Sequence, residues 1–244
     1  MTGLALHLRT ITHDYGSLRA LDGIDLTIPA GKVTMLVGPS GCGKSTLLGI
    51  IGGLIAPTSG TVRQEGTIGA DCLNPLTYVF QDFSLLPWRT VAGNVSLVLE
   101  NTRLANNDRA SRIAEALAIT GLTDFARAWP RQLSGGMRQR VGIARALAVR
   151  PAVLLMDEPL SALDAQARDL LLDEFAAIIA RTGATIVYVT HNLAEATRLG
   201  DQIVVLSRRP GTIRAILPAQ TDPADLWSLI REDAAAAERE LADG

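Results

Sequence analysis

Cysteine is scarce in this sequence. Cys42 and Cys72 are the only two among 244 residues, and neither belongs to a CxxC or Cys/His spacing. Two cysteines cannot build a disulfide framework, and the missing spacing gives no support for a structural zinc site. The sequence therefore favours a reducing compartment.

Long apolar runs are also missing, although the mean hydropathy of +0.22 is high enough to raise the question. Glycines interrupt the apolar stretch 47–56, and Arg145 and Arg150 interrupt the stretch 141–156. No segment approaches the roughly 20 apolar residues that cross a bilayer. Residues 1–16 lack a basic region followed by an apolar run and a small-residue cleavage site, so no secretory signal is expected. We expect a cytoplasmic protein that meets a membrane only through a partner.

The sequence also lacks an excess of positive charge. The formal net charge is −2, and the isoelectric point is near 5.9. Nucleic-acid binding normally needs a basic surface, so DNA and RNA are not expected as partners. Hydrophobic residues make up 48% and charged residues 20%, which is ordinary globular usage. The length fits one large domain, 1–244, with room for an inserted subdomain.

The order of the predicted elements indicates an α/β fold. Alternating and apolar stretches predict N-terminal strands, with turns at Asp22-Gly23 and Ala30-Gly31. These strands cover residues 4–10, 24–28, 33–37, 60–63 and 76–80, with a helix over 44–55. Residues 83–149 are mostly helical and predict an inserted subdomain, whose helices cover 90–100, 108–119 and 135–149.

Beyond residue 149, strands alternate with helices, which predicts a parallel sheet covered by helices. The predicted segments are strands 152–156, 184–189 and 202–206 with helices 164–180 and 193–199. The tail 222–244 reads as a helix in which Asp222 is the N-cap and Pro223 the first helical residue. Packing of this tail on the core and packing on a partner both remain open.

A glycine-rich segment matches the P-loop pattern G-x-x-x-x-G-K-S. It follows the apolar strand 33–37, precedes a predicted helix and reads Gly38-Pro39-Ser40-Gly41-Cys42-Gly43-Lys44-Ser45. Such a loop turns successive N–H groups toward phosphate oxygens. Lys44 would reach the β- and γ-phosphates, Ser45 would ligate Mg²⁺ and Thr46 would bond the α-phosphate. A chance glycine turn is the alternative, but only two lysines, Lys32 and Lys44, occur in the chain.

Two carboxylates end the apolar strand that reaches Met156. Asp157 is placed to hold Mg²⁺, directly or through water, as in P-loop enzymes. Glu158 is then available to polarise the water that attacks the γ-phosphate. The alternative is that both acids solvate the strand end before Pro159. The P-loop in the same chain favours the catalytic interpretation.

The segment Leu133-Ser134-Gly135-Gly136-Met137 precedes a predicted helix and offers a hydroxyl and free N–H groups to an anion. Alone it would be an ordinary helix cap. Placed between the P-loop and Asp157, it resembles the signature motif of ABC ATPases, and the resemblance extends over roughly residues 4–217. It implies a P-loop NTPase core of the RecA-like type, with an N-terminal antiparallel β-subdomain and an inserted helical subdomain.

The resemblance assigns further residues. Tyr15 matches the aromatic residue that stacks on adenine, and Gln81 the glutamine that touches Mg²⁺ and the attacking water. His191 matches the switch histidine at the γ-phosphate, and residues 161–164 match the loop that communicates across a dimer. The alternatives are packing for Tyr15 and a structural, hydrogen-bonded role for His191.

The resemblance also implies partners: a second ATPase subunit bound head to tail, a transmembrane permease and, indirectly, an extracytoplasmic solute-binding protein. Each ATP would lie between the P-loop of one subunit and Ser134, Gly135 and Gly136 of the other, on the inner face of the cell membrane. Met137 departs from the usual glutamine and puts one polar contact in doubt.

The apolar segment 83–88 is either a local mini-core or, as the resemblance favours, a docking site for the permease, with Leu86 and Trp88 as its main residues. Residues 85–88, Met137 and 207–211 resemble importers of nitrate, sulfonate and taurine. The alternatives are an export or lipid-extraction complex, a soluble ABC protein of DNA repair or translation, and a nucleotide-gated module that scarcely hydrolyses ATP. Glu158 and His191 disfavour the last.

Overall fold

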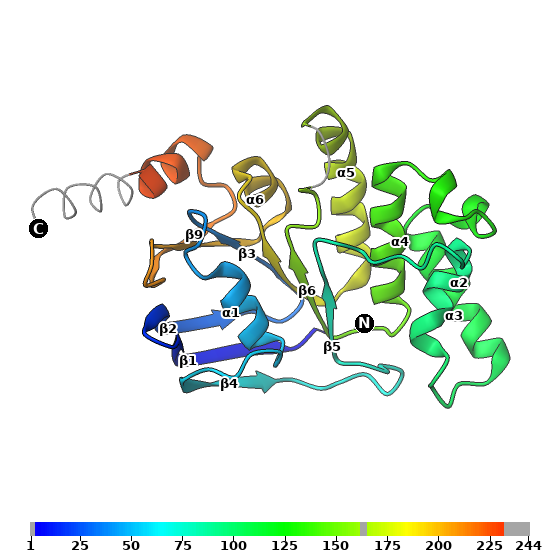
Figure 1. Cartoon of the computed structure of the whole chain (residues 1–244), viewed down its shortest axis with the longest axis horizontal. Coiled ribbons are helices and arrows are strands. Elements are labelled where there is room, and N and C mark those ends of the chain that lie inside the picture. The colour runs from blue at the N-terminus through cyan, green and yellow to red at the C-terminus, as the bar shows by residue number, and fades with distance from the viewer. Residues whose placement is uncertain (1–2, 162–164, 232–244) are drawn as a thin grey trace, which may run out of the picture. The chain divides into compact units, whose positions relative to one another are not determined.

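The computed structural model describes residues 3–161 and 165–231 (Figure 1). Two compact units divide the chain. Among the described residues, the first comprises 3–67 and 185–231, and the second comprises 68–161 and 165–184. Each unit combines strands with helices, as the alternation of predicted elements indicated.

The first unit contains an antiparallel sheet of order β2-β1-β4. Its strands are β1 (Ala5–Tyr15), β2 (Leu18–Ile28) and β4 (Ser59–Glu65). Leu8 pairs with Leu26 on β2 and with Val62 on β4. The turn predicted at Asp22-Gly23 is wrong, because both residues lie inside β2 and the chain turns at residues 16–17 instead. Register shifts between β1 and β2 break the alternation there, so that Ala20 and Leu21 are both buried.

The same unit carries four strands that hold the core of its α/β part. In the order β7-β3-β8-β9, the first three are parallel and β9 is antiparallel. Their bounds are Thr185–Val189 for β7, Val33–Val37 for β3, Gln202–Leu206 for β8 and Ile213–Pro218 for β9. Every residue of β3 and β7 is buried, as expected for parallel strands covered on both faces. The half-exposed β9 was not predicted.

Two helices of the first unit follow these strands. Helix α1 (Lys44–Ile51) is shorter than predicted, because Gly52 caps its C-terminus and Gly53 takes a positive φ of 69°. Helix α6 (Leu193–Leu199) and β8 have the predicted bounds.

The second unit contains the parallel strands β5 (Leu76–Val79) and β6 (Val153–Asp157). Its α-helices are α2 (Val91–Ser96), α3 (Asn106–Ile119), α4 (Gly135–Leu147) and α5 (Ala165–Thr182). Three short 3₁₀ helices span Leu97–Leu99, Thr123–Phe125 and Pro130–Gln132.

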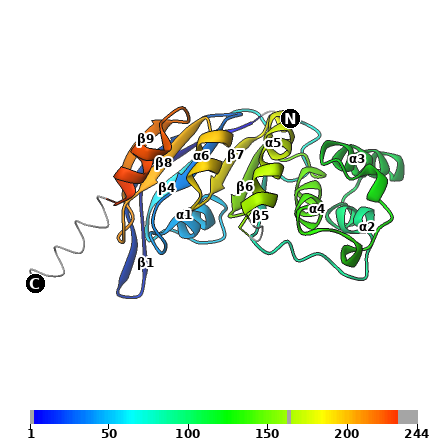
Figure 2. The ribbon, with the colours of Figure 1, turned by 90° about the horizontal axis from the view of Figure 1, so that it is seen from above.

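Helices α2, α3 and α4 pack against one another, and Figure 2 shows them side by side in green. Their contact is an apolar cluster of buried residues. It consists of Val91, Val95, Leu99, Ala116, Leu117, Leu122, Leu133, Val141, Ala144, Ala148 and Val149. The bounds 83–149 of an inserted subdomain stay a prediction, since the compact unit around these helices also includes β5, β6 and α5.

The start of the predicted tail agrees with the sequence. The Asp222 carboxylate accepts a hydrogen bond from the Ala224 N–H at 2.8 Å, and residues 223–231 are helical. The remaining residues of the predicted tail lie outside the described part. In the described ranges, no helix is long and apolar enough to span a membrane.

Candidate functional site

The phosphate loop connects β3 to α1 in the first unit. Gly43 is the N-cap of α1, and its φ of 99° lies in the left-handed region. A Cβ on Gly43 would lie only 2.7 Å from Leu21 Cδ2 and 3.0 Å from the Ala20 carbonyl oxygen, so glycine is required there. None of the described side chains caps this helix. The N–H groups of its first turn therefore form an anion site.

Lys44 is folded against this loop and is only 7% exposed. Its Nζ donates hydrogen bonds to the carbonyl oxygens of Gly38 and Pro39, each at 2.9 Å, and lies 3.8 Å from the Cys42 Sγ. The same loop brings Ser40, Gly41, Ser45 and Thr46 together around the start of α1. A buried ammonium held by backbone carbonyls is ready to turn to a phosphate.

Cys42 lies inside the loop and is 1% exposed. Burial raises the pKa of its thiol, and the charge of Lys44 only partly opposes this. The thiol therefore stays protonated near neutral pH and acts as a small packing residue.

Tyr15 stands at the end of β1, half exposed. Its hydroxyl lies 3.5 Å from the Thr46 Oγ1, and its ring meets the ring of His13 edge-on, with the centroids 4.5 Å apart. Two contacts thus orient the aromatic face beside the phosphate loop. Such a face suits a flat base.

Arg209 supports the phosphate loop from the β8–β9 turn, a role that its membership of the segment 207–211 did not predict. Its Nε and Nη2 both donate to the Gly41 carbonyl oxygen, at 3.3 and 3.1 Å. The Gly211 N–H donates to the Ala20 carbonyl at 2.9 Å, which fixes the same turn. Only the two consecutive arginines before Pro210 hinted at this role.

His191 follows β7 in the first unit and is exposed. The residues beside it are fixed firmly, because Thr190 donates to the buried Glu195 carboxylate at 2.7 Å and Tyr188 donates to it at 3.0 Å. Asn192 caps α6 by accepting hydrogen bonds from the N–H groups of Ala194 and Glu195. The histidine thus lies on a rigid turn.

In the second unit, Asp157 ends β6 and is half buried. The Tyr78 hydroxyl on the neighbouring strand β5 donates to the Asp157 Oδ2 at 3.4 Å. Burial, followed by the charge of Asp157, raises the pKa of Tyr78 well above its ordinary value. The phenol therefore remains a donor. Sequence reasoning missed Tyr78, since nothing along the chain links it to residue 157.

Glu158 has a φ of 45°, a strained conformation for a residue with a side chain. Its carbonyl oxygen accepts hydrogen bonds from the Ser161 N–H at 3.1 Å and from the Ser161 hydroxyl at 2.8 Å. These two bonds hold the backbone of Glu158 at the strand end. The other members of the predicted loop, residues 162–164, lie outside the described residues.

Ser134 is the N-cap of α4. Its hydroxyl accepts a hydrogen bond from the Met137 N–H at 3.2 Å, while Gly135 is exposed and Gly136 buried at the start of the helix. The Met137 side chain packs against the apolar cluster of α2, α3 and α4. The partly buried Met137 thus contacts the core of its own unit.

Gln81 follows β5 and is exposed. Beyond it, the apolar segment 83–88 divides into two parts. Leu85 packs against the apolar cluster, and the buried Asn94 side chain accepts from the Leu86 N–H at 2.8 Å and donates to its carbonyl at 3.1 Å. Trp88 is 68% exposed. Within the segment 83–88, Leu85 and Leu86 therefore belong to the local mini-core, whereas Trp88 lies on the surface.

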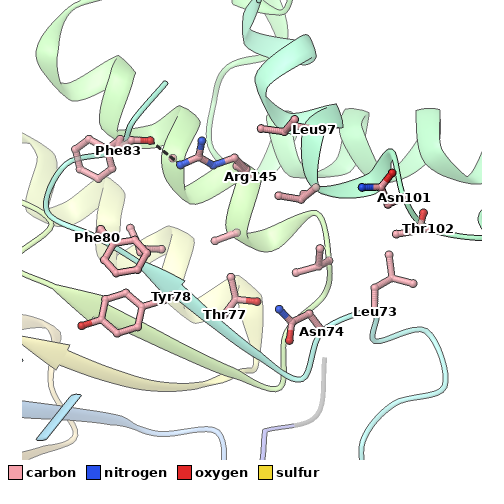
Figure 3. Close-up of a pocket in the computed structure, with 15 residues that line it drawn as sticks. Leu73, Asn74, Thr77, Tyr78, Phe80, Phe83, Leu97, Asn101, Thr102 and Arg145 are labelled. Atoms are coloured by element: carbon pink, nitrogen blue, oxygen red, sulfur yellow. Dashed lines mark hydrogen bonds between the residues drawn. The ribbon is translucent and has the colours of Figure 1, made fainter. Parts of the chain in front are cut away.

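A pocket of about 390 Å³ lies beside β5 in the second unit (Figure 3). Arg145 on α4 donates to the Phe83 carbonyl at 2.5 Å and to the Ser84 carbonyl at 3.3 Å. A Cβ on Gly142 would lie 2.6 Å from the Phe83 ring, so the loop packs directly on the α4 backbone. The helix that begins at Ser134 thereby holds the start of the loop after Gln81.

The predicted metal ligands supply oxygen atoms only: the Ser45 hydroxyl, the Gln81 amide and the Asp157 carboxylate. Among the described residues, no group of three or more His, Cys, Asp or Glu could hold a metal ion. Mg²⁺ suits this chemistry, because it is commonly held by one or two carboxylates together with substrate phosphates.

Comparisons with known proteins identify the family. Residues 21–161 match the family described as ABC transporter. An aliphatic sulfonates import ATP-binding protein of Agrobacterium fabrum is 43% identical over 84% of this chain and 77% of its own length. A nitrate import ATP-binding protein of Synechocystis is 44% identical over 82% and 75%. A putrescine transport ATP-binding protein of Escherichia coli is 40% identical over 83% of this chain but only 55% of its own length.

A similar solved structure is the ATP-binding cassette MJ0796, in a dimeric post-hydrolysis state bound to ADP and phosphate. It has a TM-score of 0.71 and 32% sequence identity, over 89% of this chain and 100% of that one. This likeness confirms the predicted fold class, a P-loop NTPase core. The chain belongs to the ABC transporter family and is an ATP-binding ATPase of that family.

Proposed function

We propose that this chain energises the import of a small solute, such as a sulfonate, taurine or nitrate, through a separate permease. The phosphate loop supports ATP as the energy source. Helix α1 begins with N–H groups that no described side chain caps, and with the buried Lys44, so that its N-terminus can bind phosphate. The cargo follows from the relatives, since sulfonate and nitrate importers match over three quarters or more of their length.

In the proposed mechanism, the loop from Gly38 to Thr46 wraps the ATP phosphates and Tyr15 stacks on the adenine. Lys44 exchanges two backbone carbonyls for the β- and γ-phosphate oxygens, which offer it full negative charge. His191 contacts the γ-phosphate from its rigid turn.

Ser45, Gln81 and Asp157 would hold Mg²⁺, which neutralises charge that develops on the phosphates. Glu158 accepts a hydrogen bond from the attacking water and aims it at the γ-phosphorus. The bonds from Ser161 to its carbonyl fix the backbone position from which the Glu158 side chain extends.

A second copy of the chain completes the site in this proposal. Ser134, Gly135 and Gly136 of the second copy would bind the γ-phosphate from the opposite side, and closure on ATP would supply the mechanical stroke. The dimeric state of the MJ0796 structure supports this arrangement.

The permease would contact the exposed Trp88 side of the segment 83–88, on the cytoplasmic face of the membrane. A solute-binding protein outside the cell would select the cargo. Trp88→Ala is expected to lower permease-stimulated ATP hydrolysis more than basal hydrolysis. An equal loss of both would return Trp88 to a structural role.

Glu158→Gln tests the catalytic proposal. The variant should bind ATP and form a stable dimer in saturating ATP, measured by light scattering after gel filtration, while hydrolysis is abolished. A Glu158→Gln variant that stays monomeric in saturating ATP would contradict the dimeric site. Uptake of labelled taurine, nitrate and putrescine into vesicles holding the permease tests the cargo, and uptake of putrescine alone would overturn the assignment of a sulfonate, taurine or nitrate cargo.

A further inference from the structure

Tyr78 lies on β5 opposite Leu155 of β6, two residues before Asp157 on the neighbouring strand. Parallel strands bring their carboxyl ends to one edge of a sheet. This register brings the phenol within reach of a carboxylate far away in the sequence, and the Tyr78 hydroxyl donates to the Asp157 Oδ2 at 3.4 Å.

The ring of Tyr78 is held from a second direction. Phe80, the residue before Gln81, stacks on it with the ring centroids 4.2 Å apart and an angle of 22° between the planes. Phe80 itself is 53% exposed, and both rings line the pocket in Figure 3. The Phe80 ring thus packs on one face of the Tyr78 ring and supports the orientation in which its hydroxyl donates to Asp157.

We propose that Tyr78 is a positioning residue for the metal site: its hydroxyl holds the Asp157 Oδ2 so that the other carboxylate oxygen is presented to Mg²⁺. This inference rests on the proposed role of Asp157 as a metal ligand. Hydrogen bonds to a ligating carboxylate fix its orientation, and their loss typically costs about 10–100-fold in metal affinity. The bond of 3.4 Å is long, as catalytic hydrogen bonds often are before the substrate is bound.

Tyr78→Phe removes one oxygen atom and keeps the stacked ring. With the protein saturated with ADP, Mn²⁺ affinity measured by electron paramagnetic resonance is expected to fall about tenfold. ADP affinity in EDTA is expected to stay unchanged, because no nucleotide contact is lost. The readout is metal binding and is independent of turnover.

Thr77→Val is the matched control on the same strand. It also deletes one hydroxyl without changing the side-chain shape, and the Thr77 Oγ1 is buried with no hydrogen-bond partner in the described structure. Mn²⁺ affinity should therefore equal that of the wild type. An equal loss in Thr77→Val and Tyr78→Phe would mean a general effect on β5 and would overturn the inference.

Asp157→Asn separates this inference from the proposed function. If Asp157→Asn weakens Mn²⁺ binding and Tyr78→Phe does not, Tyr78 has no positioning role, while the metal site stands. If Asp157→Asn itself leaves Mn²⁺ affinity unchanged, the proposed ligand is wrong and the inference fails with it.

Discussion

Two helices of this molecule begin at glycine-rich segments, and they begin differently. Helix α1 starts after Gly43, which has no side chain to cap it. Helix α4 starts after Ser134, whose hydroxyl already accepts a hydrogen bond from the Met137 N–H. Both N-termini attract anions through their N–H groups.

The two N-termini therefore differ in the number of hydrogen-bond donors that are available to a phosphate in an isolated subunit. At α1 the first-turn donors and Lys44 converge, so of these two helices α1 should contribute most to nucleotide binding. At α4 the serine satisfies one donor and can change partner when a phosphate arrives. We infer that α1 determines nucleotide affinity and α4 determines hydrolysis.

The largest expected effect is on α1. Lys44→Ala should weaken ATP binding about 10–100-fold, because hydrogen bonds to charged groups contribute about 1.5–3 kcal/mol each. Isothermal titration calorimetry measures the ATP affinity of the variant and of the wild type. Lys32→Ala is the control, since Lys32 is the only other lysine and its Nζ bonds the exposed Asp201 at 3.0 Å. Unchanged affinity in Lys44→Ala would remove the lysine from the phosphate site.

Ser134→Ala should produce the opposite pattern. Hydrolysis by the Ser134→Ala dimer should be about tenfold slower than by the wild type, whereas the ATP affinity of the subunit should change less than about twofold. The lost cap also costs about 1 kcal/mol of unfolding free energy. Thr90→Ala is the matched control, because Thr90 caps α2 in the same way through the Gly93 N–H. If Thr90→Ala lowers hydrolysis as much, the effect of Ser134→Ala is only a loss of stability.

Gly43→Ala tests whether ATP binding depends on the backbone conformation and close packing at the N-terminus of α1. The left-handed φ costs about 1–2 kcal/mol for alanine, and the new Cβ would clash with Leu21 Cδ2, so ATP affinity should fall several-fold. Gly53→Ala carries the same backbone strain, with a φ of 69° and nothing within 4 Å of the new Cβ. It should lower the melting temperature and leave affinity unchanged. Equal affinities of the two variants would contradict the close packing at Gly43.

The smallest expected effect concerns the rate at which the Cys42 thiol is alkylated. Alkylation needs the thiolate, and burial raises the pKa of Cys42, so iodoacetamide should react slowly at pH 7 and faster as pH rises. Bound ATP should slow the reaction further. Mass spectrometry follows the modified peptide. Fast alkylation at pH 7 would show that the loop around α1 opens in solution.

Short sequence patterns predicted those features that depend on neighbouring residues. The segment 38–45 predicted the phosphate loop because its glycines and lysine are consecutive. The bounds of α6 and β8 followed from clear polar and glycine boundaries at Asn192 and Gly200. The N-cap Asp222 was predictable because Pro223 follows it and suits the first helical position.

Contacts between distant residues could not be predicted in this way. Tyr78 and Asp157 are joined only by the register of β5 and β6, and Arg209 reaches Gly41 only through the placement of the β8–β9 turn. Bulges between β1 and β2 hid a continuous strand from the alternation rule and made Asp22-Gly23 look like a turn. The roles of Gln81 and His191 stay predictions.

A mixing experiment tests the central claim most directly, namely that α1 of one copy and α4 of another serve the same ATP. Lys44→Ala and Ser134→Ala proteins are each measured alone and then mixed in equal amounts. Random pairing makes half of the dimers mixed, each with one intact pair of helix ends, so hydrolysis should rise to roughly a quarter of the wild-type rate. Activity of the mixture no higher than the average of the two variants would contradict the head-to-tail site.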